Sequence, residues 1–166
     1  MSHLRRAVLP LLLAVLAAGC GWHLRGAGSA SLSGLTLAVE SRLHALEPRA
    51  ALIRGLRTAG ATVSESRGEV DAVLVLAEET VQRRVLANDP SSRIQEVEIG
   101  YRLRYALERP DGEVLADDAV TTSQVYRADR DNVLSGQAQE ERVTERLRQD
   151  AVRLLLPRVQ AALKRP

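Results

Sequence analysis

Few residues of this chain have the types and spacing that catalysis requires. The three histidines, His3, His23 and His44, stand far apart, and none belongs to a cluster with metal-ligand spacing. Asp117 and Asp118 form a carboxylate pair, but neighbouring side chains of a strand point to opposite faces and do not converge on one substrate. The sequence therefore favours a binding or structural protein over an enzyme. A hydrolase using Asp117, Asp118 or His44 is the catalytic alternative.

The single cysteine, Cys20, is placed for covalent modification. It closes an apolar run, 7–18, that follows Arg5 and Arg6. A basic start, an apolar middle and small residues at the end are typical of a secretory signal. The run is shorter than the roughly 20 apolar residues that a membrane-spanning helix needs. One thiol in an exported chain cannot form an internal disulfide, which points to another use.

The segment 17–20, Ala-Ala-Gly-Cys, resembles a bacterial lipobox, with alanine at position 17 where leucine is usual. The resemblance implies cleavage after Gly19 and a covalent lipid on Cys20, the only non-protein group that we expect. Two or more acyl chains anchor a protein stably. Gly21 is not the aspartate that retains lipoproteins in the inner membrane, which favours an outer-membrane lipoprotein. The alternative is an ordinary signal peptide with an incidental cysteine.

Cleavage changes the charge of the chain. The full sequence has 23 basic and 21 acidic residues, and removal of Arg5 and Arg6 leaves 21 of each. A neutral mature chain gives no support to nucleic-acid binding through net charge. Only Lys164 is a lysine, and arginine suits bidentate binding of phosphate or carboxylate.

The pattern divides the chain into three parts: a signal peptide (1–19), a lipidated N-terminus and linker (20–34) and one domain (35–164). Residues 26–34 are rich in Gly and Ser, as in flexible linkers. A mature chain of this length is suited to one domain.

Alternation of apolar and polar residues predicts strands at 35–40, 97–108 and 114–126. The unbroken apolar run 72–77 predicts a strand buried on both faces that continues toward Val85. Residues 88–92 have loop composition.

Two helices complete the prediction. Glu47-Pro48 opens the first, and Gly60 is a plausible stop. In the last third, apolar residues recur at three and four positions, and Pro157 is expected to end or kink that helix. The predicted class is α+β: a four-stranded, mostly antiparallel sheet with two helices packed on one face, in the order β-α-β-β-β-α.

Arginines gather on the expected long strands and the loops between them. They are Arg83, Arg84, Arg93, Arg102, Arg104, Arg127 and Arg130. Such a group can hold a phosphorylated glycolipid through charge-assisted hydrogen bonds. The alternative is a set of ordinary surface ion pairs with nearby acids, which contribute little.

The residues directly after the cysteine carry a family resemblance. Cys20-Gly21-Trp22-His23-Leu24-Arg25 is similar to the mature start of the LptE family of lipopolysaccharide-assembly lipoproteins. Arg57 to Val63, the long hairpin and Val133-Leu134-Ser135 are similar to that family in order, so the resemblance spans nearly the whole chain.

The resemblance implies a non-enzymatic subunit that is lipid-anchored at the periplasmic side of the outer membrane. Its partners would be the β-barrel LptD, whose lumen it plugs and whose assembly it helps, and lipopolysaccharide. Trp22 is then expected at the membrane interface and Arg25 near lipid phosphates. A lysine of one family member corresponds here to the uncharged Ser135-Gly136-Gln137, so Arg93 and Arg130 are the candidate lipopolysaccharide contacts. A generic envelope lipoprotein that binds another protein or a small ligand is the alternative.

Overall fold

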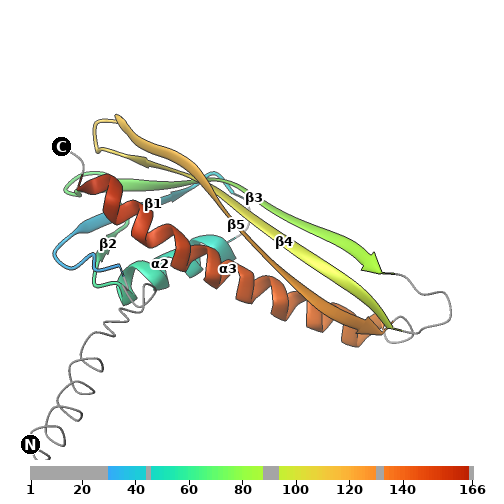
Figure 1. Ribbon diagram of the computed structural model, residues 1–166. Helices are drawn as coiled ribbons and strands as arrows, with labels where there is room; N and C mark the ends of the chain where they lie inside the picture. Colours follow the sequence, from blue (N-terminus) through green and yellow to red (C-terminus); the bar gives the residue numbers. More distant parts are fainter. Residues whose placement is uncertain (1–29, 44–45, 88–93, 130–132, 165–166) are drawn as a thin grey trace, which may run out of the picture.

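The computed structural model describes residues 30–43, 46–87, 94–129 and 133–164. Its two helices lie on one face of a single sheet whose strands differ greatly in length (Figure 1). In chain order the elements are β1 (Thr36–Ser41), α2 (Glu47–Thr58), β2 (Thr62–Ser64), β3 (Ala72–Ala87), β4 (Ile94–Glu108), β5 (Val114–Asp129) and α3 (Val133–Leu163). The α+β class is therefore confirmed.

The sheet has five strands in the order β2-β1-β3-β4-β5 and is mixed, so the prediction of four mostly antiparallel strands is wrong in part. Strand β2 pairs in parallel with β1, and β1 pairs in parallel with β3. Strands β3, β4 and β5 are antiparallel neighbours. A three-residue strand such as β2 is too short to show alternation in the sequence. The parallel pairs arise because the helix α2 carries the chain back before it re-enters the sheet.

One main core lies between the sheet and both helices, which confirms that the helices share a face. The sheet contributes alternate residues of β4, from Val97 to Leu107, all almost fully buried. The helices contribute apolar stripes: Ala51, Leu52 and Leu56 from α2, and Val143, Leu147, Ala151, Val152, Leu155, Leu156 and Val159 from α3. Packing of aliphatic side chains thus supplies most of the core of a chain without phenylalanine.

The first part of β3 is buried on both faces, as its unbroken apolar run predicts. On the face away from the helices, Val73 and Val75 pack with Ala38 in a second, smaller cluster. Arg67, from the segment before β3, bonds Glu40 on β1 at 2.6 and 2.8 Å and Glu108 on β4 at 2.9 Å. Glu108 is the one buried charged residue among those the structure describes, and Arg67 supplies its counter-charge.

Helix α2 begins and ends where the sequence predicts. Pro48 lies in its first turn. Gly60 has a φ of 90°, and the N–H groups of Gly60 and Ala61 donate to the carbonyls of Arg57 and Leu56. This is the double hydrogen bond by which a left-handed glycine closes a helix.

Helix α3 continues through Pro157 to Leu163, so Pro157 does not end it. A proline removes the hydrogen bond to the carbonyl four residues earlier, here that of Arg153. Pro157 and Arg153 are both exposed, so water can solvate the freed carbonyl. Leu155 and Val159, on either side, are anchored in the core. The Ser135-Gly136-Gln137 segment, expected in the approach to this helix, belongs to its first turns.

The described end of the expected linker packs against the domain. Leu32 is fully buried, and its N–H donates to the carbonyl of Ala59 at 2.8 Å. The ordered chain therefore includes residues before β1.

Beyond the short strands, β3, β4 and β5 continue as a three-stranded extension with α3 along it (Figure 1). We call residues 78–87, 94–104 and 119–129 the arm. Strand β1 pairs with β3 only as far as Leu76, so the edge of β3 within the arm has no neighbouring strand among the described residues. The end of the arm farthest from β1 is its distal end.

Candidate functional site

A cleft of about 220 Å³ lies at the distal end of the arm, next to the first turns of α3. Arg83 reaches it from β3, Tyr126 from β5 and Glu140 from α3. The remaining lining residues are Gln95, Ala128, Asp129, Gly136 and Gln137. These residues come from four elements, β3, β4, β5 and α3, and they meet only because the strands of the arm pair and α3 packs on them.

The charges of this cleft compensate one another. Nε of Arg83 is 3.3 Å from Oε2 of Glu140, and the Tyr126 hydroxyl donates to the same oxygen at 3.3 Å. Partial burial, followed by the nearby charge of Glu140, raises the pKa of Tyr126. An anion that binds Arg83 has to compete with Glu140, so the cleft alone is a weak anion site.

Most predicted site residues lie outside the described residues. These are Cys20, the motif Gly21, Trp22, His23, Leu24 and Arg25, and also His44, Arg93 and Arg130. Their roles remain predictions. The described neighbours of the two candidate arginines, Ile94 and Asp129, are register partners in the β4–β5 pair. In the sequence, Arg93 directly precedes Ile94 and Arg130 directly follows Asp129.

Asp117 and Asp118 do not converge, as their adjacent positions on a strand predict. Asp117 bonds Arg104 of β4, with 3.0 Å between Oδ2 and Nη2. Asp118 bonds Arg158 of α3, at 2.6 Å. The N–H of Ala119, and then Arg158, hold the pKa of Asp118 below its ordinary value. The two carboxylates thus form their ion pairs on opposite faces of β5.

No group of three His, Cys, Asp or Glu side chains in the described part of the chain is arranged to hold a metal ion. Within the same residues, no helix is long and apolar enough to cross a membrane.

The face of the arm away from the helices carries a row of cross-strand ion pairs. Arg84 bonds Glu98 at 2.6 Å, and Arg127 lies 3.5 Å from Glu96. For these arginines and Arg104, the interpretation as surface ion pairs is confirmed. The result is a polar face with both signs of charge interspersed.

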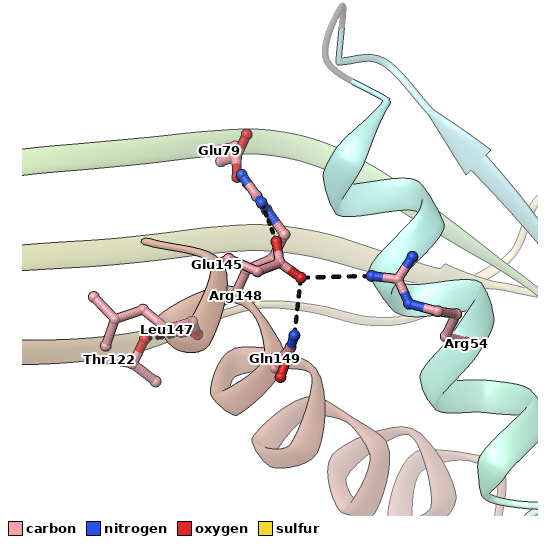
Figure 2. Close-up of polar contacts among 7 residues, drawn as sticks. All are labelled: Arg54, Glu79, Thr122, Glu145, Leu147, Arg148 and Gln149. Atoms are coloured by element: carbon pink, nitrogen blue, oxygen red, sulfur yellow. Dashed lines mark hydrogen bonds and ion pairs between the residues drawn. The ribbon is translucent and has the colours of Figure 1, made fainter. Parts of the chain in front are cut away.

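A polar cluster between α3 and the sheet escaped the sequence analysis (Figure 2). Arg148 of α3 donates to Glu79 of β3 from Nε at 3.2 Å and to Glu145 at 2.6 Å. The other oxygen of Glu145 accepts a hydrogen bond from Gln149 of α3 at 2.9 Å and lies 3.5 Å from Arg54 of α2. This cluster connects both helices to β3.

Arginine is usually a surface residue, but the side chain of Arg148 is only 12% exposed. Its guanidinium carbon lies 6.0 Å from the ring centre of Tyr101. One signal was present in the sequence: Arg148 precedes the apolar Ala151, Val152 and Leu155 by three, four and seven positions, which puts it beside the buried stripe.

The family model for LptE, described as lipopolysaccharide-assembly, matches residues 35–159, well over half of the chain. No curated protein matches the chain significantly. Several solved structures share the fold. Lipoprotein B from Nitrosomonas europaea has a TM-score of 0.68 at 23% identity, over 85% of this chain and 91% of its own.

The rare lipoprotein B from Shewanella oneidensis has a TM-score of 0.65 at 20% identity, over 76% of this chain and 94% of its own. A minor lipoprotein from Acinetobacter baumannii has a TM-score of 0.63 at 19% identity, with coverages of 76% and 90%. At these identities the likeness shows the fold alone, whereas the family model covers β1 through most of α3. The chain therefore belongs to the LptE family of lipopolysaccharide-assembly lipoproteins.

Proposed function

We propose that this chain is a lipoprotein of the outer membrane that plugs and supports the β-barrel LptD during delivery of lipopolysaccharide to the cell surface. The match of the LptE family model to residues 35–159 carries the proposal. A lipid on Cys20 anchors the domain at the periplasmic side, with Trp22 at the membrane interface and Arg25 near lipid phosphates. The protein acts by binding and not by catalysis.

The arm has the surface that such a plug requires. The lumen of a large barrel is polar, and the row of ion pairs Arg84–Glu98, Arg104–Asp117 and Arg127–Glu96 gives the arm a polar face. Long paired strands with α3 behind them form a stiff body. A small, rigid domain of mixed charge fits a lumen better than a flexible chain does.

For lipopolysaccharide we propose contacts at the distal end, through Arg93 and Arg130. Both adjoin the Ile94–Asp129 pair, and Arg83 lies in the cleft nearby. Arginine forks bind phosphate through paired, charge-assisted hydrogen bonds. Arg83 is partly neutralised by Glu140, so Arg93 and Arg130 supply most of the attraction.

Affinity purification of the mature lipoprotein from solubilised outer membranes tests the barrel partner. We expect a large β-barrel protein to co-purify in a constant ratio, and depletion of the chain to lower surface lipopolysaccharide. Recovery of the lipoprotein alone, with surface lipopolysaccharide unchanged, contradicts the proposal and supports the generic envelope lipoprotein.

A separate measurement tests the glycolipid contacts. The variant Arg93→Gln with Arg130→Gln should bind lipopolysaccharide several-fold more weakly but still co-purify with the barrel. The control is Arg153→Gln on α3, whose side chain is 77% exposed. Equal binding by both variants removes Arg93 and Arg130 from the site.

A further inference from the structure

The free edge of β3 has a feature that the proposed function does not use. Between two irregularities in its register, Glu78 to Val85 form a regular strand that pairs only with β4. Alternate backbone N–H and C=O groups of this stretch point away from β4 and are available to another strand. The question is which strand fits.

We propose that a second copy of the chain pairs with this edge, antiparallel, about a two-fold axis at Val81. In this register Glu78 faces Arg84 of the second copy, Glu79 faces Arg83, Thr80 faces Gln82 and Val81 faces itself. Residues opposite each other on antiparallel strands lie on the same face. Each opposed pair of charged residues therefore joins an acid and a base, and the two-fold symmetry produces each pair twice.

In this register, the opposed residues lie on the same side of the sheet. Glu79, Val81 and Arg83 are register partners of the buried Leu103, Tyr101 and Ile99, so they lie on the helix side. Glu78 and Arg84 are partners of Arg104 and Glu98 on the other side. The pairing places helix side beside helix side, and the two sheets continue as one.

Val81 and Arg84 of the proposed interface are exposed, whereas Glu79 is largely covered by its ion pair with Arg148. Val81 is 44% exposed although it is apolar, and the side chain of Arg84 is 71% exposed. Pairing would cover Val81 with its own copy and give Glu78 a cation across the interface. Arg84 keeps Glu98 at its other side. On the face away from the helices, the proposed pairing therefore breaks no existing ion pair.

Neighbouring registers of the β3 edge lack this complementarity, and on the β5 edge the charges are already paired within the chain. A shift of two residues places Glu79 opposite Val85 or opposite Val81, and the charge match is lost. On β5, a two-fold axis at Thr122 would place Asp117 opposite Arg127, but these side chains already pair with Arg104 and Glu96. On the β3 edge, by contrast, Glu78 accepts a hydrogen bond from Thr80, and its charge is left for a partner across the interface.

The oligomeric state of the full mature lipoprotein in mild detergent tests this proposal, which does not depend on LptD or lipopolysaccharide. Sedimentation in density-matched detergent should show a concentration-dependent dimer. A monomer at every concentration overturns the proposal.

Disulfide cross-linking tests the axis. Val81→Cys should form a covalent dimer rapidly under mild oxidation, because the two side chains face each other. Val114→Cys, 56% exposed at the start of β5, is the control for chance collisions within one micelle. Equal rates for the two variants overturn the proposal, as does a Val81→Cys chain that links only to a larger protein.

A charge exchange tests the register. Glu78→Arg places two arginines opposite each other and should weaken the dimer about tenfold. Adding Arg84→Glu restores opposite signs and should restore the dimer. Weakening without restoration, at an unchanged unfolding midpoint, overturns the register.

Discussion

Glu79 and Arg148 are 69 residues apart and meet as a largely buried ion pair, with 3.2 Å between Oε1 of Glu79 and Nε of Arg148. Their side chains are only 14% and 12% exposed. Helix α3 packs mainly on β5 and β4, so this pair ties it to the third strand of the arm. Removing one partner leaves a poorly solvated charge.

We expect Arg148→Met to lower the free energy of unfolding by about 3 kcal/mol, because Glu79 stays behind without its cation. Adding Glu79→Leu should recover much of the loss, since a buried pair is often replaceable by apolar residues. Urea unfolding measures both. The control, Arg153→Met, removes an exposed arginine of the same helix and should change stability by less than about 0.5 kcal/mol. Additive losses for Arg148→Met and Glu79→Leu contradict the coupling.

Tyr101→Phe tests a buried hydroxyl. Tyr101 is fully buried, and its hydroxyl has no hydrogen-bond partner among the described residues. Burial, followed by the charge of Glu79, raises its pKa. Removing a buried, unpaired hydroxyl should leave stability unchanged or raise it by about 1 kcal/mol. A loss of more than about 1 kcal/mol in urea unfolding reveals a hydrogen bond that the hydroxyl makes.

Acid should weaken the domain through Glu40 and Asp118. The hydrogen bonds from Arg67 hold the pKa of Glu40 below its ordinary 4.5, and the N–H of Ala119 does the same for Asp118 from 3.8. A lowered pKa in the folded state stabilises the fold above the ordinary value. That contribution is lost as the pH falls through the lowered value.

Stability should therefore be level above about pH 5 and decline below about pH 4.5. Glu40→Gln and Asp118→Asn should each flatten the decline, while Glu65→Gln, at an exposed position outside these contacts, should not. The midpoint of urea unfolding, measured for each variant between pH 3 and 7, shows how steeply its stability declines. A decline of the same steepness in all variants assigns the acid sensitivity to other groups.

Gly55→Ala tests the contact between the helices. A Cβ at position 55 would overlap Cγ1 of Val152 on α3. Alanine in a helix interior ordinarily gains up to about 1 kcal/mol over glycine, but overpacking costs about 1–3 kcal/mol. We expect a net loss of about 1 kcal/mol in thermal or urea unfolding.

The matched control is Gly136→Ala in α3, where an added Cβ meets no atom within 4 Å. It should be neutral or stabilising. In the Val152→Ala background, Gly55→Ala should no longer destabilise. Persistence of the loss there contradicts the steric explanation.

Local patterns in the sequence were sufficient for most of the fold. The alternation in 97–108 predicted β4, and the apolar run at 72–77 predicted a strand buried on both faces. Glu47-Pro48 and Gly60 predicted the limits of α2. Such signals are local because strand and helix periods repeat within a few residues.

The sequence did not reveal what depends on distant partners. Strand β2 is too short for a pattern and exists because β1 offers an edge. Pro157 remains inside α3 because Leu155 and Val159 hold both sides of it in the core. The burial of Arg148 depends on Glu79, a partner on β3 that lies 69 residues away in the chain.

The sequence by itself therefore determined the family, the predicted anchor at Cys20 and most of the elements. These depend on residue types and short spacings. Only the tertiary structure decided the five-stranded mixed sheet, the cleft of Arg83, Tyr126 and Glu140, and the free edge of β3. Each of these arises where elements distant in the chain meet, or where a neighbour is absent from the described strands, and pairing across such distances leaves no local pattern.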